Sequence, residues 1–503
     1  MSVSGASRYV LALLLGAGTT LSFAPVGAWP IGLLALAGLY YLWREATPGT
    51  AALTGFSFGL GLYTSGVSWV YISMHDYGAM PAPLAALATL LFAAYLALWP
   101  ALAGYLQARL PARGVPWLAI PAAWCLTEWL RGWVFTGFPW LGIGYAHTDG
   151  PLAGLAPLVG VHGLNFAAAL VAVLLVAIAC GSVPHTPWSQ RLKPAAALTL
   201  LLGASWLTGF VGWAVPHQDP VRVALLQGNI SQELKFEEGR FEATLEGYRR
   251  LIEAHPATLV VLPETALPRM LHTIPRRYLD ELAELALARG ADLVFGVPLA
   301  ESQGRYFNSV VTMGASPQQR YDKAHLVPFG EFIPFGFRWF VDLMKIPLGD
   351  FTRGSASPRA LMLGSQRLAI NICYEDLFGE EIIRQLPAAT MLVNVSNIAW
   401  FGDSLAPHQH LQISRMRSLE TARPMLRATN TGMTAVIDHR GRVLRSLKPF
   451  TAEALTANVQ ATSGLTPYVR SGNWPAISAS VLLLLSGLSL GQRRRDAPGR
   501  PPA

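Results

Sequence analysis

About eight apolar runs of roughly membrane-spanning length constrain the fold of this 503-residue chain more than any other feature. A transmembrane helix needs about 20 mostly apolar residues. Seven runs precede a long polar segment and one follows it; they cover residues 9–26, 29–43, 51–72, 83–106, 117–133, 159–183, 194–215 and 474–490. The pattern predicts a polytopic α-helical membrane domain of about eight transmembrane helices, joined to one soluble domain.

Basic residues mark alternate ends of these runs and give the predicted helices an orientation. They are Arg8, Arg44, Arg109, Arg113, Arg191, Lys193, Arg493, Arg494 and Arg495. Cytoplasmic loops of membrane proteins carry an excess of Lys and Arg. We therefore expect both termini in the cytoplasm and the polar segment on the outer face, which in a bacterium is the periplasmic face of the inner membrane.

These patterns divide the chain into four predicted parts. Residues 1–217 form the N-terminal membrane domain with about seven transmembrane helices, and residues 218–465 form the periplasmic soluble domain. Residues 466–491 contain a C-terminal transmembrane helix. The tail 492–503 is polar and Pro-rich, so we expect it to be cytoplasmic and disordered.

Charge and cysteine content exclude several classes of function. The net charge is +8, but Lys and Arg are scattered or lie at helix ends, so no nucleic-acid partner is expected. Cys125 and Cys180 lie in apolar runs, which leaves Cys373 as the one thiol of the polar segment. No metal-type Cys/His cluster and no disulfide framework is present in the sequence, and we expect neither a metal nor an organic cofactor.

Short β-branched runs alternate with helical patterns in the polar segment. Strands are predicted at 222–230, 257–265, 292–299, 306–313, 367–373, 390–397, 426–432 and 434–444, with Gly441 in a hairpin turn. Amphipathic helices are predicted at 241–255 and 276–290. Buried strands with helices between them indicate a layered α/β domain, in which functional residues lie at strand ends.

Three reactive side chains follow apolar runs of this segment. Glu264 ends LVVLPE, Lys323 lies in RYDKAHLVPFGEF, and Cys373 ends RLAINIC. A free thiol has a pKa of about 8.5 and needs a base or a neighbouring cation to react. Lys323 can favour the thiolate and stabilise an oxyanion, while Glu264 can move the proton. Each residue alone has a structural explanation, but together they predict a nucleophilic site that forms a thioester.

The runs LPET, DKAHLVPFGE and NICYED resemble the nitrilase (carbon–nitrogen hydrolase) superfamily, whose members carry a Glu–Lys–Cys triad on an αββα sandwich. With its apolar runs, the whole chain resembles the membrane-bound apolipoprotein N-acyltransferase family of that superfamily. Further matches are LTEWLRGW, GFPWL, QGNI and SNIAWFGDS. The resemblance implies a bacterial inner-membrane enzyme with a periplasmic nitrilase-like domain.

The resemblance also implies roles for single residues. Glu264 matches the general base, Lys323 the oxyanion-stabilising lysine and Cys373 the nucleophile. Active-site support is implied for three more residues, Glu331, Tyr374 and Glu375. Relatives carry Trp at the position of Phe236, so a stacking role there survives but an indole N–H does not.

The implied reaction is a ping-pong transfer between two lipid substrates. A phospholipid, typically phosphatidylethanolamine, gives its sn-1 acyl chain to Cys373. The α-amino group of the diacylglyceryl-cysteine of a diacylated apolipoprotein then accepts it as an amide. Membrane lipids are therefore expected partners of the chain.

Two aromatic residues are further candidates for substrate contact. Trp339 lies in the apolar loop 332–351, which we expect to guide acyl chains at the bilayer surface, a buried core segment being the alternative. Trp140 lies in a Gly/Pro-broken stretch, where an interfacial anchor is the alternative. The nearby Glu128 and Arg131 have the spacing of an intrahelical ion pair.

Two other functions fit part of the pattern. A membrane-anchored amidase or nitrilase would pass the thioester to water, but an anchor needs one span rather than seven. A lipid transporter or receptor would use the outer domain for binding only. Its spans should carry paired intramembrane charges, and apart from Glu128 and Arg131 the apolar runs are nearly free of charge.

Overall fold

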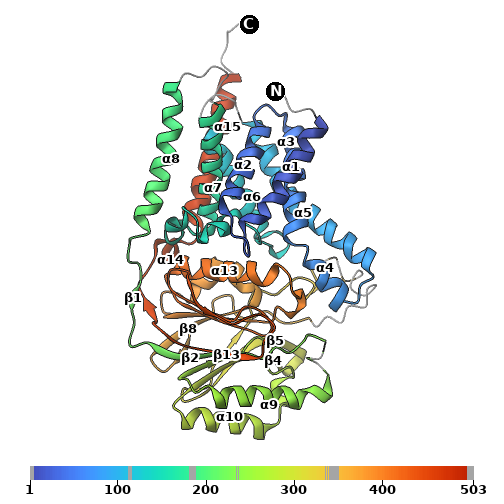
Figure 1. Cartoon of the computed structure of the whole chain (residues 1–503), viewed down its shortest axis with the longest axis vertical. Helices are drawn as coiled ribbons and strands as arrows, with labels where there is room; N and C mark the ends of the chain where they lie inside the picture. Colours follow the sequence, from blue (N-terminus) through green and yellow to red (C-terminus); the bar gives the residue numbers. More distant parts are fainter. Residues whose placement is uncertain are drawn as a thin grey trace. The chain divides into compact units, whose positions relative to one another are not determined.

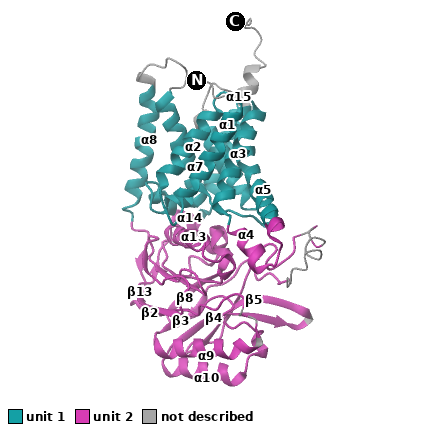
Figure 2. Ribbon diagram, turned by 45° about the vertical axis from the view of Figure 1, so that its right-hand side comes forward, with its two compact units in different colours: residues 1–68, 86–211, 471–503 teal, residues 69–85, 212–470 magenta. Residues whose placement is uncertain are grey.

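The computed structural model describes residues 5–110, 116–180, 188–233, 235, 237–334, 336, 338 and 350–495. The chain forms two compact units, coloured separately in Figure 2. Unit 1 comprises Met1–Ser68, Ala86–Val211 and Ser471–Ala503, and unit 2 comprises Trp69–Ala85 and Gly212–Arg470. Nothing in the sequence indicates that Trp69–Ala85 packs with the soluble domain.

Unit 1 is a bundle of long helices whose axes run alongside one another (Figure 1). The helices are α1 (Gly5–Thr19), α2 (Trp29–Trp43), α3 (Pro48–Gly66), α5 (Ala82–Arg109), α6 (Pro116–Arg131), α7 (Ala156–Cys180), α8 (Trp188–Thr208) and α15 (Trp474–Arg495). Glycine allows α1 and α3 to approach closely, because a Cβ on Gly16 would lie 1.9 Å from the main-chain oxygen of Phe58. A Cβ on Gly61 would lie 2.0 Å from that of Leu13. Small residues of this kind are typical of helix contacts in membranes.

Each of the eight apolar runs contains a helix, but length and composition do not confirm eight membrane spans. Among the described residues, Ala82–Arg109 and Ala153–Cys180 are long and apolar enough to cross a membrane, and Trp29–Trp43 and Trp474–Gly487 are shorter apolar helices. Helices α1 and α2 have 15 residues and α6 has 16, which is below the length of a full span. Gly, Ser and Thr residues lower the mean hydropathy of helix α3, and helix α8 begins with basic and polar residues.

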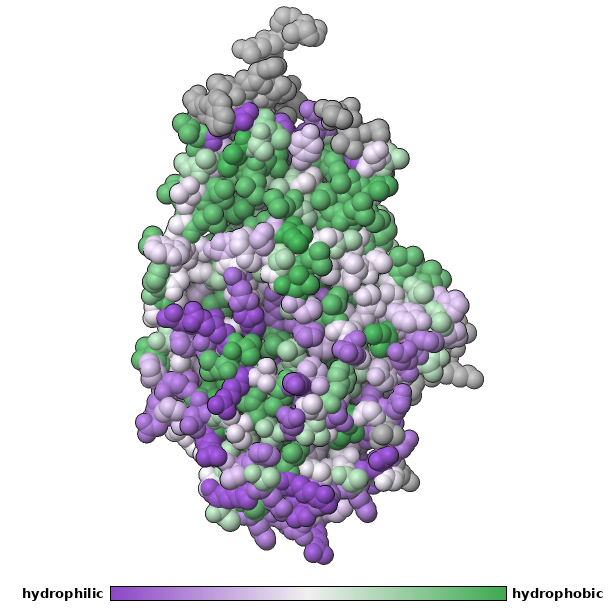
Figure 3. All heavy atoms as spheres, in the orientation of Figure 1, coloured by the Kyte–Doolittle hydropathy of each residue, from purple (hydrophilic) through white to green (hydrophobic). Residues whose placement is uncertain are grey.

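The surface of unit 1 is nevertheless rich in exposed apolar side chains. Figure 3 shows them gathered over the long helices on the face that it displays. Leu34, Leu91 and Leu200 are among those exposed. Soluble proteins rarely expose contiguous apolar patches of this kind, so the surface fits a lipid environment.

Unit 2 contains two six-stranded sheets. One has the order β13-β2-β3-β4-β5-β6 and consists of β13 (Glu453–Val459), β2 (Val221–Gln227), β3 (Leu259–Val261), β4 (Asp292–Glu301), β5 (Arg305–Gly314) and β6 (Arg320–Asp322). The other has the order β12-β11-β10-β9-β8-β7 and consists of β12 (Val443–Ser446), β11 (Ala435–Ile437), β10 (Met425–Thr429), β9 (Met391–Ser396), β8 (Gln366–Ile372) and β7 (Leu361–Leu363). A two-stranded ribbon joins β1 (Val215–Pro216) to β14 (Thr462–Ser463). All the strands predicted from β-branched runs are present.

The two sheets pack face to face, with helices on their outer faces (Figure 1). Side chains alternate along a strand: Val223 on β2 joins the core between the sheets, while Ala224 faces the helical side. Helices α9 (Glu238–Ala254) and α10 (Arg276–Ala288) cover the first sheet, and α13 (Ala406–Thr421) covers the second. The predicted αββα sandwich is therefore confirmed for unit 2.

Short helices among the described residues include α4 (Val70–Ile72), a π-helical turn at Ser73–Tyr77, α12 (Gly379–Ile382) and α14 (Pro467–Ser471). The predicted hairpin is also present, with Gly441 at φ +74° between β11 and β12. Strands β2, β3 and β4 are parallel, as are β8, β9 and β10. Carboxyl ends of parallel strands meet at one edge, and this arrangement positions the site.

Candidate active site

Cys373 occupies a sharp turn at the end of β8. Its φ is +53°, in the left-handed region that costs a non-glycine residue about 1–2 kcal/mol. The chain turns there from the strand into the 3₁₀-helix Cys373–Leu377. Two donors stabilise the turn at the main-chain oxygen of Cys373: the Asn394 amide at 3.2 Å and the His410 imidazole at 3.3 Å. The strained conformation is thus held by groups on β9 and α13.

Glu264 follows β3 and is buried. One carboxylate oxygen accepts from the Asn308 amide at 2.7 Å and from the Lys323 ammonium at 3.3 Å. The other accepts from the main-chain N–H of Asn397 at 2.8 Å. Burial favours the neutral acid, but the Lys323 charge and these hydrogen bonds outweigh it and hold the pKa of Glu264 below its ordinary value. Glu264 is therefore ionised and able to accept a proton.

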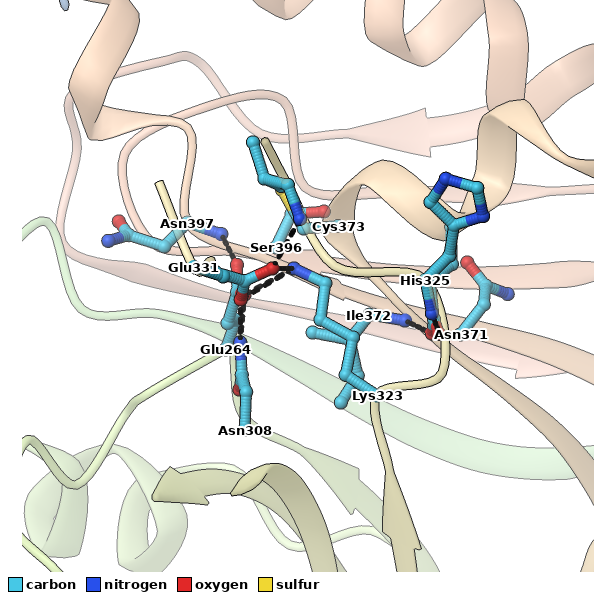
Figure 4. Close-up of polar contacts among 12 residues, drawn as sticks. Glu264, Asn308, Lys323, His325, Glu331, Asn371, Ile372, Cys373, Ser396 and Asn397 are labelled. Carbon is cyan, nitrogen blue, oxygen red and sulfur yellow. Dashed lines mark hydrogen bonds and ion pairs between the residues drawn. The ribbon is translucent and has the colours of Figure 1, made fainter. Parts of the chain in front are cut away.

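Lys323 follows β6 and is also buried. Its ammonium lies 2.9 Å from the carboxylate of Glu331 as well as 3.3 Å from that of Glu264. Burial alone would lower the pKa of Lys323, but the two carboxylates raise it well above its ordinary value. Figure 4 shows the ammonium directed at the two carboxylates, with Cys373 beside the group. Lys323 is therefore a fixed positive charge in the site.

Asn308, on β5, bridges the carboxylates of Glu264 and Glu331. Its side-chain amide donates at 2.7 Å to Glu264 and at 2.7 Å to Glu331. Its main-chain oxygen accepts from the N–H of Lys323 at 2.9 Å. Glu331 also accepts from the main-chain N–H of Val327 at 2.9 Å, which orders the loop after Lys323. Asn308 was not predicted as a site residue, because a single amide side chain within a strand has no distinctive sequence pattern.

The state of the Cys373 thiol differs from the sequence-based expectation that Lys323 would favour the thiolate. Burial and the charges of Glu264 and Glu331 raise the pKa of the thiol well above its ordinary value, and Lys323 only partly opposes them. The physical reason is that Lys323 is already paired with two carboxylates. Cys373 therefore rests as a thiol, and its proton would have to leave if the sulfur attacked a substrate. Glu264 is the ionised carboxylate of the group that can take it.

Glu375 ties the Cys373 turn to the loop that carries Lys323. Its carboxylate accepts from the main-chain N–H groups of Ile372 (2.7 Å), Ala324 (2.7 Å) and His325 (3.0 Å), and from the Tyr321 hydroxyl at 2.9 Å. Burial raises the pKa of Glu375 to about 7, against the effect of these donors. The residue holds two parts of the site together.

Tyr374, the residue before Glu375, contacts aromatic rings, whereas main-chain N–H groups and a hydroxyl surround the carboxylate of Glu375. The Tyr374 ring is buried, with its centroid 5.8 Å from that of His325 and 5.3 Å from that of Phe378. His325 in turn stacks on Phe378 at 3.6 Å. Tyr374 therefore packs against His325 and Phe378, and its role as active-site support stays a prediction.

A buried polar network lies next to the turn at Cys373. The carboxylate of Asp376 accepts from the His410 Nε2 at 2.7 Å, the Ser414 hydroxyl at 2.5 Å and the Arg427 guanidinium at 3.2 Å. Arg427 also donates at 2.7 Å to Asn394, which reaches the oxygen of Cys373. An arginine, Arg427, in the middle of the predicted strand 426–432 is the sequence signal that could have indicated this network.

Of the three predicted substrate contacts, the structure describes Trp140 alone. Trp140 lies in unit 1, where its ring stacks on Phe138 at 5.9 Å and its main-chain oxygen accepts from Arg131 at 2.8 Å. Arg131 also forms the predicted ion pair with Glu128. Phe236 and Trp339 lie outside the described residues. Among the residues that the structure covers, no group of three or more His, Cys, Asp or Glu could hold a metal ion.

Comparison with known proteins gives matches to both halves of the chain. Residues 222–468 match the family model described as carbon-nitrogen hydrolase, and residues 15–174 match the model described as apolipoprotein N-acyltransferase N-terminal domain. A curated apolipoprotein N-acyltransferase from Nitrosomonas europaea is 48% identical over 496 residues, covering 96% of this chain and 98% of its own. One from Ralstonia nicotianae is 50% identical over 502 residues, covering 97% and 94%. A carbon-nitrogen hydrolase structure from Helicobacter pylori covers 51% of this chain and 94% of its own, at 18% identity and a TM-score of 0.37.

Proposed function

The chain belongs to the apolipoprotein N-acyltransferase family and is an acyltransferase, and we propose that Cys373 carries the acyl group as a thioester during lipoprotein N-acylation. The observation that carries this proposal is the position of Cys373. It lies at a strained turn beside the ionised Glu264 and the ion-paired Lys323. These are the base, cation and nucleophile that acyl transfer through a thiol requires.

The first half-reaction acylates Cys373. Its sulfur attacks the sn-1 ester carbonyl carbon of a phospholipid, which we propose to be phosphatidylethanolamine, and Glu264 takes the thiol proton in the same step. The charge that develops on the carbonyl oxygen is stabilised by Lys323, whose third N–H is not used by its two carboxylate partners. The ester C–O bond then breaks, Glu264 returns the proton to the departing alkoxide, and lysophospholipid leaves.

The second half-reaction transfers the acyl group to the lipoprotein. The α-amino group of the N-terminal diacylglyceryl-cysteine attacks the thioester carbon, and Glu264 accepts one of its protons. The C–S bond breaks as the oxyanion collapses, and the sulfur recovers the proton from Glu264. The products are an amide and the free thiol, so no external oxidant, reductant or cofactor enters the balance.

The enzyme is membrane-associated, as its family implies. We propose a multi-pass protein of the bacterial inner membrane, with about eight spans and unit 2 in the periplasm. The alternation of Lys and Arg between apolar runs supports this orientation. The two long apolar helices and the exposed apolar side chains of unit 1 support a lipid environment.

Mass spectrometry of the purified full-length protein tests the proposal. After exposure to phosphatidylethanolamine in detergent micelles, Cys373 should gain the mass of one acyl chain, and a diacylated lipopeptide should then remove it as an amide. Cys373→Ala should show no adduct, whereas the control Cys180→Ala in unit 1 should behave as wild type. An unmodified Cys373 in active protein overturns the proposal. Release of free fatty acid without an amide product would instead indicate a hydrolase.

A further inference from the structure

A second buried lysine lies in the active-site region, and the reaction described above does not use it. Lys235 lies in the connection between β2 and α9, and its side chain is buried. Its ammonium donates to the main-chain oxygen of Glu264 at 3.3 Å. Lys235 thus contacts the main chain of Glu264, whereas Lys323 contacts its side-chain carboxylate.

The ammonium of Lys235 has no carboxylate within ion-pair distance among the described residues. The charge nevertheless interacts with two groups of the site, Glu264 and Cys373. Burial lowers the pKa of Lys235 to about 8, and these two groups oppose the shift. Burial of a cation without an ion-pair partner is unfavourable, so an anion that forms in the site would stabilise the charged form of Lys235.

The charges around Cys373 indicate which anion that is. Glu264 and Glu331 carry two negative charges, and Lys323 carries one positive charge. The group without Lys235 thus has an excess of one negative charge, which opposes any further negative charge on the sulfur. Lys235 makes the group neutral. Because charges in a buried site interact strongly, this difference affects every step in which negative charge builds up.

We propose that Lys235 is the second cation of the site, and that it stabilises the negative charge formed first on the sulfur of Cys373 and then on the oxygen of the attacked carbonyl. Lys323 orders Glu264 and Glu331 and gives its remaining N–H to the reaction. Lys235 supplies the positive charge that balances the second carboxylate, which Lys323 alone does not. The inference rests on Cys373 being the nucleophile of the proposed function.

A structural role would give a different result. If Lys235 only anchors its loop to the oxygen of Glu264, a neutral donor should replace it. Lys235→Gln keeps an N–H donor and removes the charge, and Lys235→Arg keeps the charge. The two variants therefore separate charge from hydrogen bonding.

The test compares alkylation of Cys373 by iodoacetate, which is anionic, and by iodoacetamide, which is neutral and similar in size. The full-length protein in detergent is treated with each reagent, and the Cys373 peptide is quantified by mass spectrometry. We expect Lys235→Gln to lower the iodoacetate-to-iodoacetamide rate ratio by about tenfold. Lys235→Arg should keep the wild-type ratio, as should the control Lys448→Gln at an exposed position.

An unchanged ratio in Lys235→Gln overturns the inference, and so does an equal loss of the ratio in Lys235→Arg, which would mean that shape rather than charge matters. Acyl-enzyme formation from phosphatidylethanolamine should fall at least tenfold in Lys235→Gln and recover in Lys235→Arg. The alkylation ratio does not require acyl transfer. Failure of the proposed function, seen as an unacylated wild-type Cys373, is thus distinguishable from failure of this inference.

Discussion

The Nε2 of His410 lies 3.3 Å from the main-chain oxygen of Cys373 and connects the turn at Cys373 to helix α13. The same nitrogen lies 2.7 Å from the carboxylate of Asp376. Both neighbours are acceptors, so Nε2 must carry the proton, a tautomer that we assign from the hydrogen-bond network. Burial is the main reason that the pKa of His410 is lowered, so the ring is neutral at pH 7.

Replacing His410 should therefore affect both stability and the position of the thiol. We expect His410→Ala to lower the free energy of unfolding by about 1–3 kcal/mol, because Asp376 and the oxygen of Cys373 lose a buried donor. Acyl-enzyme formation should also slow in the protein that remains folded. His410→Gln, whose amide can reach the same acceptors, should recover most of that rate, and a Gln variant as slow as Ala would contradict a positioning role. Denaturant unfolding and single-turnover mass spectrometry measure the two effects.

The buried His410 also predicts how stability changes with pH. Its folded-state pKa is depressed, so below about pH 6.5 the unfolded chain binds a proton that the folded chain does not. Wild-type stability should therefore fall as the pH drops from 7 to 5, by more than in His410→Gln, which cannot titrate. The difference between the two proteins isolates this residue, because other groups contribute to both. Equal slopes of unfolding free energy against pH would show that His410 is not buried as a neutral ring.

Glu375 gives a third prediction, because its oxygens accept from three main-chain N–H groups and one hydroxyl. In Glu375→Gln, an amide NH₂ group must face donors on one side, whichever way it is oriented. We expect a loss of about 2–4 kcal/mol of stability and a large decrease in acylation, because a buried donor left unsatisfied costs about 1–3 kcal/mol. Tyr321→Phe removes only the hydroxyl and is the milder comparison. A fully stable and active Glu375→Gln protein would contradict the assignment of Glu375 as a link between the turn and the Lys323 loop.

The sequence predicted the parts of the site that depend on local pattern. Glu264 and Cys373 follow apolar runs that become strands β3 and β8. These strands belong to different sheets, and the packing of the two sheets on each other brings their carboxyl ends together. Asn308 and Lys235 were missed, because their contacts arise only when β5 and the loop after β2 reach Glu264 in three dimensions. The protonation of Cys373 could not be predicted either, since it depends on how many carboxylates share Lys323.

In the fold, too, features set by local sequence pattern could be predicted, and features set by contacts between distant residues could not. Strands and amphipathic helices of unit 2 follow from periodicity and β-branched content. The inclusion of Trp69–Ala85 in unit 2 does not, because it depends on contacts such as that between the Trp69 indole and Gln409, 340 positions apart in the sequence. The close approach of helices at glycines in unit 1 could not be predicted either, because it depends on which helices pack against each other.

Asn308 gives a prediction about the pH dependence of the reaction. Its amide donates to Glu264 and is one of the groups that hold the pKa of that carboxyl low, against the effect of burial. In Asn308→Ala the pKa of Glu264 should rise, so less of the base is ionised at a given acidic pH. The rate of acyl-enzyme formation should therefore fall more at pH 5 than at pH 8. A loss that is equal at both values would mean that Asn308 acts only by positioning.

The segment Trp69–Ala85 should contribute to the stability of unit 2 through Trp69. The Trp69 indole N–H donates to the Gln409 side chain at 3.2 Å, and its ring lies 4.6 Å from that of Phe401, next to Trp400 and its partner Tyr77. Trp69→Phe keeps a ring but loses the hydrogen bond, so we expect a loss of about 1 kcal/mol. Trp69→Ala also loses the buried ring and should cost about 3–5 kcal/mol. Because Phe401 follows the stretch that includes Asn397, whose N–H binds Glu264, only the Ala variant should also slow acylation of Cys373. Equal stability of the two variants, measured by denaturant unfolding, would mean that this segment does not pack on unit 2 in solution.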